Sequence, residues 1–141
     1  MAIWHRSCTL EELNEAVQGN LCGLLGIIFT EIGSDSLTAE MPVDERTRQP
    51  AGLLHGGASA VLAETVGSFA SHLCLDPEIY YAVGQQVSAS HLRPVRSGKV
   101  TGKAVPLHLG RRNHLWDISI TNSAGQLCCS ARLTTAILSR R

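Results

Sequence analysis

QPAGLLHGGASAVLAETVGS, residues 49–68, contains one charged side chain, Glu64, among glycines, alanines, serines and aliphatic residues. Its apolar residues recur with helical spacing after a segment rich in turn-forming residues. The pattern predicts a loop over residues 44–55 and a long helix over residues 56–73. The position of Glu64 on that helix therefore decides how the segment is interpreted.

A helical wheel of residues 56–73 separates an apolar face from the face that carries Glu64. The apolar face, which we expect to contact a sheet, consists of Leu62, Val66, Phe69 and Leu73, with Ala58 and Ala70 at its margins. The residues around Glu64 are all small: Gly57, Ala60, Gly67, Ser68 and Ser71. A stripe of small residues allows another helix, a backbone or a ligand to approach closely. We interpret Glu64 as a functional candidate, with an ordinary exposed helix residue as the alternative.

The start of the predicted helix reads His55-Gly56-Gly57. Backbone N–H groups in a first helical turn lack partners in the helix and lie at the positive end of its dipole. Such donors suit a developing oxyanion, as in acyl transfer, although the glycines would also serve a tight turn. Gly56 and Glu64 are about 12 Å apart along a helix, too far to act on one carbonyl. If both are catalytic, Glu64 of one subunit must face Gly56 of another across a two-fold axis.

The flanking sequence predicts an antiparallel sheet. Thr9 and Glu12 form a capping-box pattern for a short helix over residues 10–18. Residues 25–32 and 36–43 form a predicted hairpin, whose second strand points inward at Leu37, Ala39, Met41 and Val43. Four more strands are predicted over residues 83–93, 98–108, 113–121 and 126–138. This order predicts one α+β domain over residues 1–141, with an antiparallel sheet wrapped around the central helix.

Composition excludes several classes of protein. Only 17 % of the 141 residues are charged, which is low for a monomer of this size and indicates an oligomer. The five cysteines form no CxxC pair, and the six histidines lack metal-ligand spacing, so we expect no metal site and a reducing, cytoplasmic location. No long apolar run or signal sequence is present, so we expect a protein that is neither exported nor membrane-spanning.

Charge is distributed unevenly along the chain. Residues 1–82 carry 3 basic and 11 acidic side chains, whereas residues 83–141 carry 9 basic and 1 acidic. Either the fold mixes the two halves, or the basic segments 91–99 and 110–112 form a local site for an anionic group. Zero net charge and few aromatic residues argue against a nucleic-acid partner.

Four blocks of sequence resemble the hotdog-fold acyl-CoA thioesterases. They are MPVDERTRQPAGLLHGGASAVLAETVGS (41–68), VGQQVSASHLRPVRSGKV (83–100), PLHLGRRNHLWDI (106–118) and CCSARLTTAIL (128–138). The closest branch is that of the bacterial 1,4-dihydroxy-2-naphthoyl-CoA and enterobactin-proofreading thioesterases, which are similar to the Arthrobacter-type 4-hydroxybenzoyl-CoA thioesterases. The resemblance implies a hotdog fold and a homotetramer built as a dimer of dimers with shared active sites.

The same resemblance implies a catalytic set. Glu64 matches the family's catalytic carboxylate, which acts as general base or as nucleophile. Gly56 matches the glycine whose backbone N–H polarises the thioester carbonyl. Gln49 and His55 match residues that orient the thioester, and Ser68 matches a residue that helps to position the nucleophile or water.

Substrate-binding positions follow from the resemblance as well. They are Val83, Gly84, His91, Arg93 and Arg111, which would contact CoA or the acyl group. Considered without the resemblance, His91 is more simply interpreted as a structural histidine with satisfied hydrogen bonds.

The resulting hypothesis is hydrolysis of an acyl-CoA or acyl-carrier-protein thioester with an aromatic acyl group. Thioesters are already activated, so carbonyl polarisation and a base or nucleophile suffice, and we expect no cofactor beyond the CoA of the substrate. A hydro-lyase on the same fold and a non-catalytic acyl-CoA-binding module are the alternatives.

Overall fold

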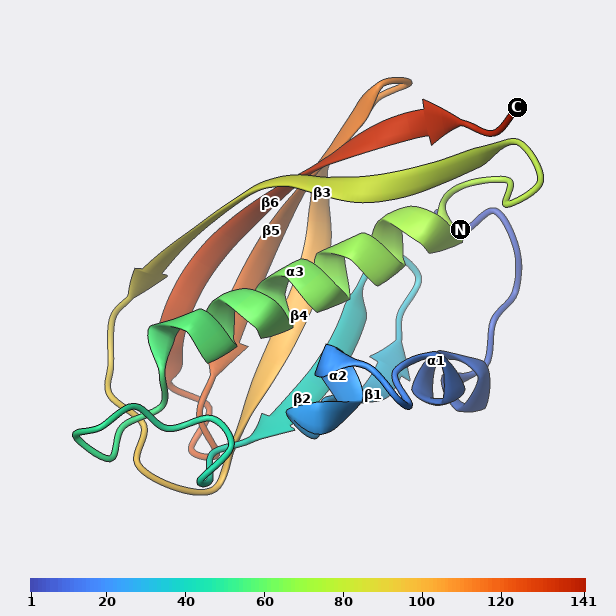
Figure 1. Cartoon of the computed structure of the whole chain (residues 1–141). Coiled ribbons are helices and arrows are strands. Elements are labelled where there is room, and N and C mark those ends of the chain that lie inside the picture. Colours follow the sequence, from blue (N-terminus) through green and yellow to red (C-terminus); the bar gives the residue numbers. More distant parts are fainter.

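The computed structural model describes residues 1–141 and consists of one antiparallel sheet curved around a long helix (Figure 1). The helices are α1 (Leu10–Ala16), α2 (Leu21–Leu24) and α3 (Gly56–Leu73). The strands are β1 (Ile28–Ile32), β2 (Leu37–Pro42), β3 (Tyr80–His91), β4 (Lys99–Leu109), β5 (Asn113–Thr121) and β6 (Leu127–Ser139). The predicted α+β architecture and the predicted bounds of the central helix are confirmed.

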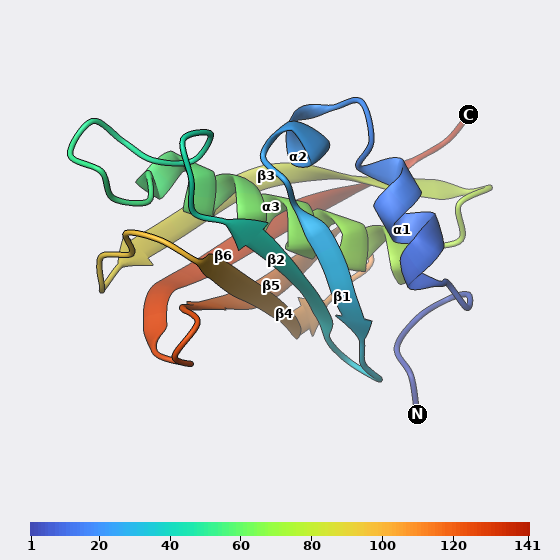
Figure 2. The same ribbon diagram turned by 90° about the horizontal axis from the view of Figure 1, so that it is seen from below.

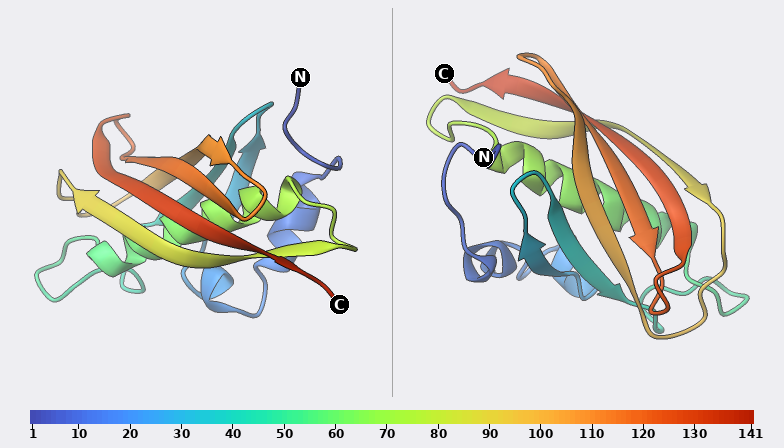
Figure 3. Two further views of the ribbon diagram at one scale, coloured as in Figure 1. Left: turned by 90° about the horizontal axis from the view of Figure 1, so that it is seen from above. Right: turned by 180° about the vertical axis from the view of Figure 1, so that it is seen from behind.

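The path of the chain places α3 across the concave face of the sheet. The strand order is β1-β2-β4-β5-β6-β3, and every neighbouring pair is antiparallel. The chain leaves β2, follows α3 and returns as β3 at the opposite edge of the sheet (Figure 2). As a result β3 pairs only with β6, and its outer edge has no partner strand in the chain (Figure 3).

The core lies between α3 and the concave face of the sheet. Leu62 and Val66 of α3 are completely buried, as predicted. Phe69 is partly buried and packs against Phe29 of β1, with ring centroids 4.8 Å apart. The second hairpin strand points into this core as predicted, with Leu37, Ala39, Met41 and Val43 all buried. Alternation with period two therefore identified the inward face of β2 correctly.

The small-residue stripe of α3 has a different environment from the one the wheel predicts. Gly67 packs against Leu133 of β6, and a Cβ on Gly67 would lie only 2.6 Å from the Leu133 Cδ2 atom. Ser71 is also completely buried, against β5 and β6. This part of the stripe therefore contacts the chain's own sheet, because the sheet curves around more of the helix than a flat sheet would cover.

Ser71 is the centre of a buried hydrogen-bond network. Trp116 of β5 donates its indole N–H to the Ser71 Oγ at 2.7 Å. The Nδ1 atom of His114 lies 3.0 Å from the same oxygen, and the Thr135 hydroxyl of β6 lies 2.8 Å from it. All four residues are buried. The network ties the C-terminal half of α3 to β5 and β6, since breaking any member would leave polar groups buried without partners.

His114 is expected to make folding stability depend on pH. Burial lowers the pKa of His114, and the nearby His108 adds to the effect. The unfolded chain takes up this proton near pH 6.5, while the folded chain stays neutral to lower pH, so stability falls as pH decreases below about 6.5. In His114→Gln the free energy of unfolding should fall less steeply with decreasing pH, by a slope that corresponds to at most one bound proton. Urea unfolding at a series of pH values measures it, and equal slopes in both proteins would contradict the prediction.

The N-terminal region departs from the predicted bounds. Thr9 and Glu12 form the predicted capping box, but α1 ends at Ala16 rather than at residue 18. A second short helix, α2, follows because the Asn20 side chain accepts a hydrogen bond from the Cys22 N–H and caps a new turn. Its presence delays the start of β1 from the predicted residue 25 to Ile28. No helix is both long enough and apolar enough to span a membrane.

Candidate active site

The start of α3 presents a free backbone donor. His55 is the N-cap, and its Nδ1 atom accepts the Gly57 N–H at 2.7 Å. The N–H groups of Ala58 and Ser59 donate to the His55 carbonyl. The Gly56 N–H donates to no group in the chain. It lies at the positive end of an 18-residue helix, where a negatively charged oxygen is stabilised.

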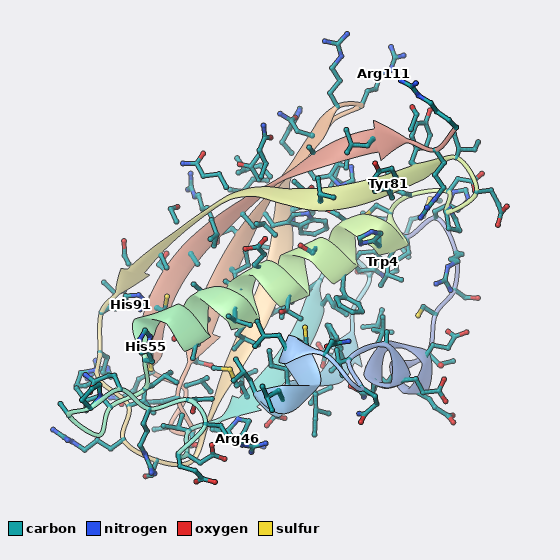
Figure 4. All side chains as sticks on the ribbon, in the orientation of Figure 1. Trp4, Arg46, His55, Tyr81, His91 and Arg111 are labelled. Atoms are coloured by element: carbon teal, nitrogen blue, oxygen red, sulfur yellow. The ribbon has the colours of Figure 1, made fainter.

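A cavity of about 360 Å³ lies next to this donor. Gln49 lines it from the loop before α3, and His91 and Arg93 line it from the end of β3. The His91 imidazole packs over Gly56, because a Cβ on Gly56 would lie 2.7 Å from the His91 Nε2 atom. Figure 4 shows His55 and His91 together at this end of α3. His91 is exposed and lines the cavity; whether it binds substrate or is a structural histidine with satisfied hydrogen bonds stays a matter of prediction.

The side chain of Gln49 is oriented by its own loop. Its carbonyl oxygen accepts the backbone N–H of Ala51. The backbone N–H of Gln49 in turn donates to the Leu53 carbonyl at 2.7 Å, which closes the loop. With the amide oxygen occupied, the NH₂ group of Gln49 is the part left to interact with a ligand in the cavity.

Glu64 lies two turns further along α3 and faces a different element. Its side chain lies against β3 at Gly84, where a Cβ would be 2.9 Å from the Glu64 Cδ atom. Glu64 does not line the cavity beside Gly56. Gly56 and Glu64 are therefore separated in the structure, as helix geometry predicts, and one chain does not bring the carboxylate of Glu64 to the free N–H of Gly56.

The remaining predicted residues lie in three places. Ser68 lines a cavity of about 260 Å³ between α1 and α3. Val83 is exposed on β3 beside Gly84. Arg111 lies at the turn between β4 and β5, at the opposite end of the molecule from His55 (Figure 4). There it lines a cavity of about 760 Å³ together with Tyr80, His108 and Arg112.

The two basic segments do not form one local site in the chain. Segment 91–99 ends at the first residue of β4, and segment 110–112 begins directly after its last residue, so the two segments lie at opposite ends of that strand. The fold also mixes the acidic and basic halves, since β2 pairs with β4. Glu40 of β2 forms an ion pair with Lys99 of β4. The first alternative, mixing of charges by the fold, is therefore the one that the structure supports within one chain.

Burial makes the thiols of Cys74 and Cys128 less nucleophilic. Burial raises the pKa of the Cys74 thiol to about 11, so it stays protonated and is a poor nucleophile at neutral pH. Cys128 lines the cavity beside Gly56, and burial raises the pKa of its thiol. No three His, Cys, Asp or Glu side chains are grouped so that they could hold a metal ion.

Sequence reasoning missed two contributions to this site. His55 was assigned to thioester orientation, but its imidazole also caps α3. A polar residue directly before the helix was the available signal. Gly84 was assigned to substrate binding, but it lies against Glu64. No sequence signal identifies that contact, since it joins residues on separate elements.

Comparison with known proteins gives consistent results. A model of the thioesterase superfamily matches residues 51–129. The 1,4-dihydroxy-2-naphthoyl-CoA hydrolase of Escherichia coli (strain K12) is 55 % identical over 136 residues, which cover 96 % of this chain and 99 % of that protein. A mutant of thioesterase PA1618 from Pseudomonas aeruginosa has a similar structure, with a TM-score of 0.97 and 50 % identity, covering 99 % of this chain and 100 % of that one. Thioesterase HI1161 from Haemophilus influenzae gives a TM-score of 0.94 and 47 % identity, with 97 % and 95 % coverage. The resemblance drawn from the sequence blocks is confirmed.

Proposed function

Because this chain belongs to the thioesterase superfamily and is a thioester hydrolase, we propose that it hydrolyses acyl-CoA thioesters whose acyl group is aromatic. Hydroxybenzoyl-CoA and 1,4-dihydroxy-2-naphthoyl-CoA are the acyl-CoAs that fit this proposal. The same acyl groups carried by an acyl-carrier protein are alternative substrates. The 55 % identity to a hydrolase named for 1,4-dihydroxy-2-naphthoyl-CoA supports the aromatic preference.

Polarisation of the thioester carbonyl is assigned to the start of α3. The free N–H of Gly56 donates to the carbonyl oxygen, and the helix dipole stabilises the negative charge that develops there. Gln49 lines the same cavity, and its NH₂ group would provide a second donor. His55 supports the site by capping the helix, which holds the Gly56 peptide in place.

Glu64 is assigned to attack on the polarised carbonyl. As a general base it removes a proton from water, and the resulting hydroxide adds to the carbonyl carbon. As a nucleophile its carboxylate adds to that carbon itself and forms a mixed anhydride, which water then hydrolyses. In both routes the carbon–sulfur bond breaks, the thiolate of CoA leaves and takes up a proton, and the free acid is released. Ser68, one turn after Glu64, would help to position the water or the carboxylate.

The observation that supports a site shared between two chains is the separation of Gly56 from Glu64 within one chain. A second copy would bring the two groups together, because the outer edge of β3 is free to pair with the β3 of a partner. Gly84 lies beside Glu64 and His91 lies beside Gly56, so pairing Gly84 of one chain with His91 of the other joins the two groups. The two-fold axis would then pass between Val87 and Ser88. The assembly would be a homodimer with two shared sites, further paired into a homotetramer in the cytoplasm.

The same antiparallel pairing supports a role for the basic residues. The cavity with Arg111 adjoins Tyr80 at the start of β3, and the cavity with Arg93 adjoins the end of β3. Antiparallel strands bring the start of one toward the end of the other. Arg111 of one chain and Arg93 of its partner would thereby bind the same CoA molecule, by forming charge-assisted hydrogen bonds with its phosphate groups.

A panel of thioesters tests the acyl preference. We expect kcat/KM for benzoyl-CoA and hydroxybenzoyl-CoA to exceed that for hexanoyl-CoA at least about tenfold, since a shaped pocket discriminates by 1–3 kcal/mol. Release of CoA thiol is measured directly, with no-enzyme reactions as background. Equal or faster hydrolysis of the alkyl substrate would contradict the aromatic preference. Crotonyl-CoA is included because hydration of its double bond without release of thiol would reveal a hydro-lyase.

A further inference from the structure

Gly84 lies where the carboxylate of Glu64 meets strand β3. The strand and α3 run close to each other along this stretch (Figures 1 and 3). A Cβ on Gly84 would lie 2.9 Å from the Cδ atom of Glu64 and 3.4 Å from its Cγ atom, and nearest of all to the Oε2 atom. Real Cβ atoms essentially never approach other heavy atoms to less than 3.0 Å. The carboxylate of Glu64 therefore occupies the space in which any other residue at position 84 would place its side chain.

The backbone at Gly84 does not itself require glycine. The glycines with positive φ are Gly19, Gly26, Gly52, Gly98 and Gly125, and Gly84 is not among them. Gly84 adjoins a shift in the register between β3 and β6, which falls between Gly84 and Gln86, but its φ is not positive, so its backbone is not in the left-handed region that alanine avoids. Glycine at position 84 therefore matters within the chain because it leaves room for the side chain of Glu64.

Strand β3 is held in place at this point, so it does not retreat from a larger residue. Gly84 pairs with Thr135 of β6, and the Thr135 hydroxyl is hydrogen-bonded to Ser71 of α3 at 2.8 Å. Gly67 of α3 packs directly against Leu133 of the same strand. These contacts fix α3 to β6, and β3 is attached to β6 by its strand pairing, so the flexible carboxylate is the group that moves most easily.

We propose that Gly84 is a positioning residue for Glu64: its lack of a side chain leaves the room in which the carboxylate lies against β3. The inference rests on the proposed function, in which Glu64 attacks the thioester. A methyl group at position 84 would displace the carboxylate without unfolding the chain. Gly84 thus acts through Glu64, in addition to any contact with substrate.

Gly84→Ala tests the proposal kinetically. We expect kcat for an aryl-CoA to fall about 10²-fold, because displacing a catalytic group by about 1 Å has effects of that size. KM should change less than about threefold, since the other predicted binding residues are unchanged and the methyl group is directed at Glu64. Gly102→Ala is the matched control: it adds the same methyl group to a strand glycine that faces α3. There the methyl would lie 3.1 Å from Leu62 instead of Glu64, so kcat should stay at the wild-type value in the folded protein.

An unfolding cycle tests the contact without measuring activity. Gly84→Ala should give a lower urea midpoint, relative to its parent, in the wild-type background than in the Glu64→Ala background, because only in the wild type must the methyl group displace a carboxylate. Gly102→Ala should shift the midpoint equally in both backgrounds. An equal shift for Gly84→Ala in both backgrounds would overturn the proposal, as would an unchanged kcat or a change confined to KM. If Glu64→Gln stays fully active, it is the proposed function that fails, and the unfolding cycle still decides whether Gly84 and Glu64 interact.

Discussion

Glu64→Gln is expected to lower kcat for hydrolysis of an aryl-CoA about 10²–10⁴-fold, the range typical of removing a general base. Glutamine has the shape of glutamate but neither takes up a proton at neutral pH nor attacks a carbonyl carbon efficiently. Glu64 is partly exposed in the middle of α3, so exchanging it for an isosteric neutral residue leaves the core intact. The midpoint of urea unfolding should therefore change little. Steady-state kinetics with one aryl-CoA measures the loss.

Glu31→Gln provides the matched control for that measurement. Glu31 is exposed on β1, at the opposite edge of the sheet from β3. The substitution removes the same charge at a place where no substrate is expected, so kcat should be unchanged. If Glu64→Gln and Glu31→Gln both retain wild-type kcat, Glu64 is not the attacking group.

Mixing two inactive variants is expected to restore activity if the site is shared between chains. Glu64→Ala lacks the carboxylate but keeps the Gly56 N–H, and Gly56→Pro lacks the N–H but keeps the carboxylate. A mixed dimer then contains one complete site and one site that lacks both groups. After equal mixing and exchange, about a quarter of wild-type activity should return, because half of the dimers are mixed and each keeps one of two symmetric sites.

The structure supports proline as the residue that removes the donor. Gly56 is the first helical residue, where proline is well tolerated. His55 before it has φ −68° and ψ 131°, the extended conformation that a following proline requires. Gly56→Ala serves as the control, since its Cβ also presses on the His91 ring but its N–H remains. Differently tagged subunits show by native mass spectrometry that mixed dimers have formed. Mixed dimers without activity would place the complete site within a single chain.

The elements that sequence predicted best are those fixed by local periodicity. The bounds of α3 were predicted without error because apolar spacing, the glycines at its start and the end of the pattern near Leu73 agree. The inward face of β2 followed from strict alternation in the same way. The order of the strands was not predictable from pattern, because β3 pairs with β6 through contacts between residues about 50 positions apart.

The sequence predicts which residues belong to the candidate site, but it does not predict which parts of α3 the sheet covers. The helical wheel places Gly67 and Ser71 in the stripe of small residues, outside the face that is expected to contact the sheet, since it assumes that a sheet covers only one face of a helix. Curvature of the sheet brings Leu133 and Thr135 onto these residues, and no local pattern reports curvature. The distance argument was more robust, because the rise per residue of a helix is constant wherever the helix lies. It anticipated correctly that Glu64 and Gly56 are separated in one chain.

The free edge of β3 affects how newly synthesised chains behave before they associate. Tyr80–His91 contains no Lys, Arg, Asp or Glu, and such charges are what normally prevents an exposed strand from adding to other chains. A newly synthesised protomer would present the unpaired outer edge of this twelve-residue strand until a second copy covers it. Substitutions that weaken the pairing would then appear in cells as precipitated protein rather than as soluble monomers. If the proposed dimer forms, encounter between identical chains would be a step of maturation as well as a requirement for a complete site.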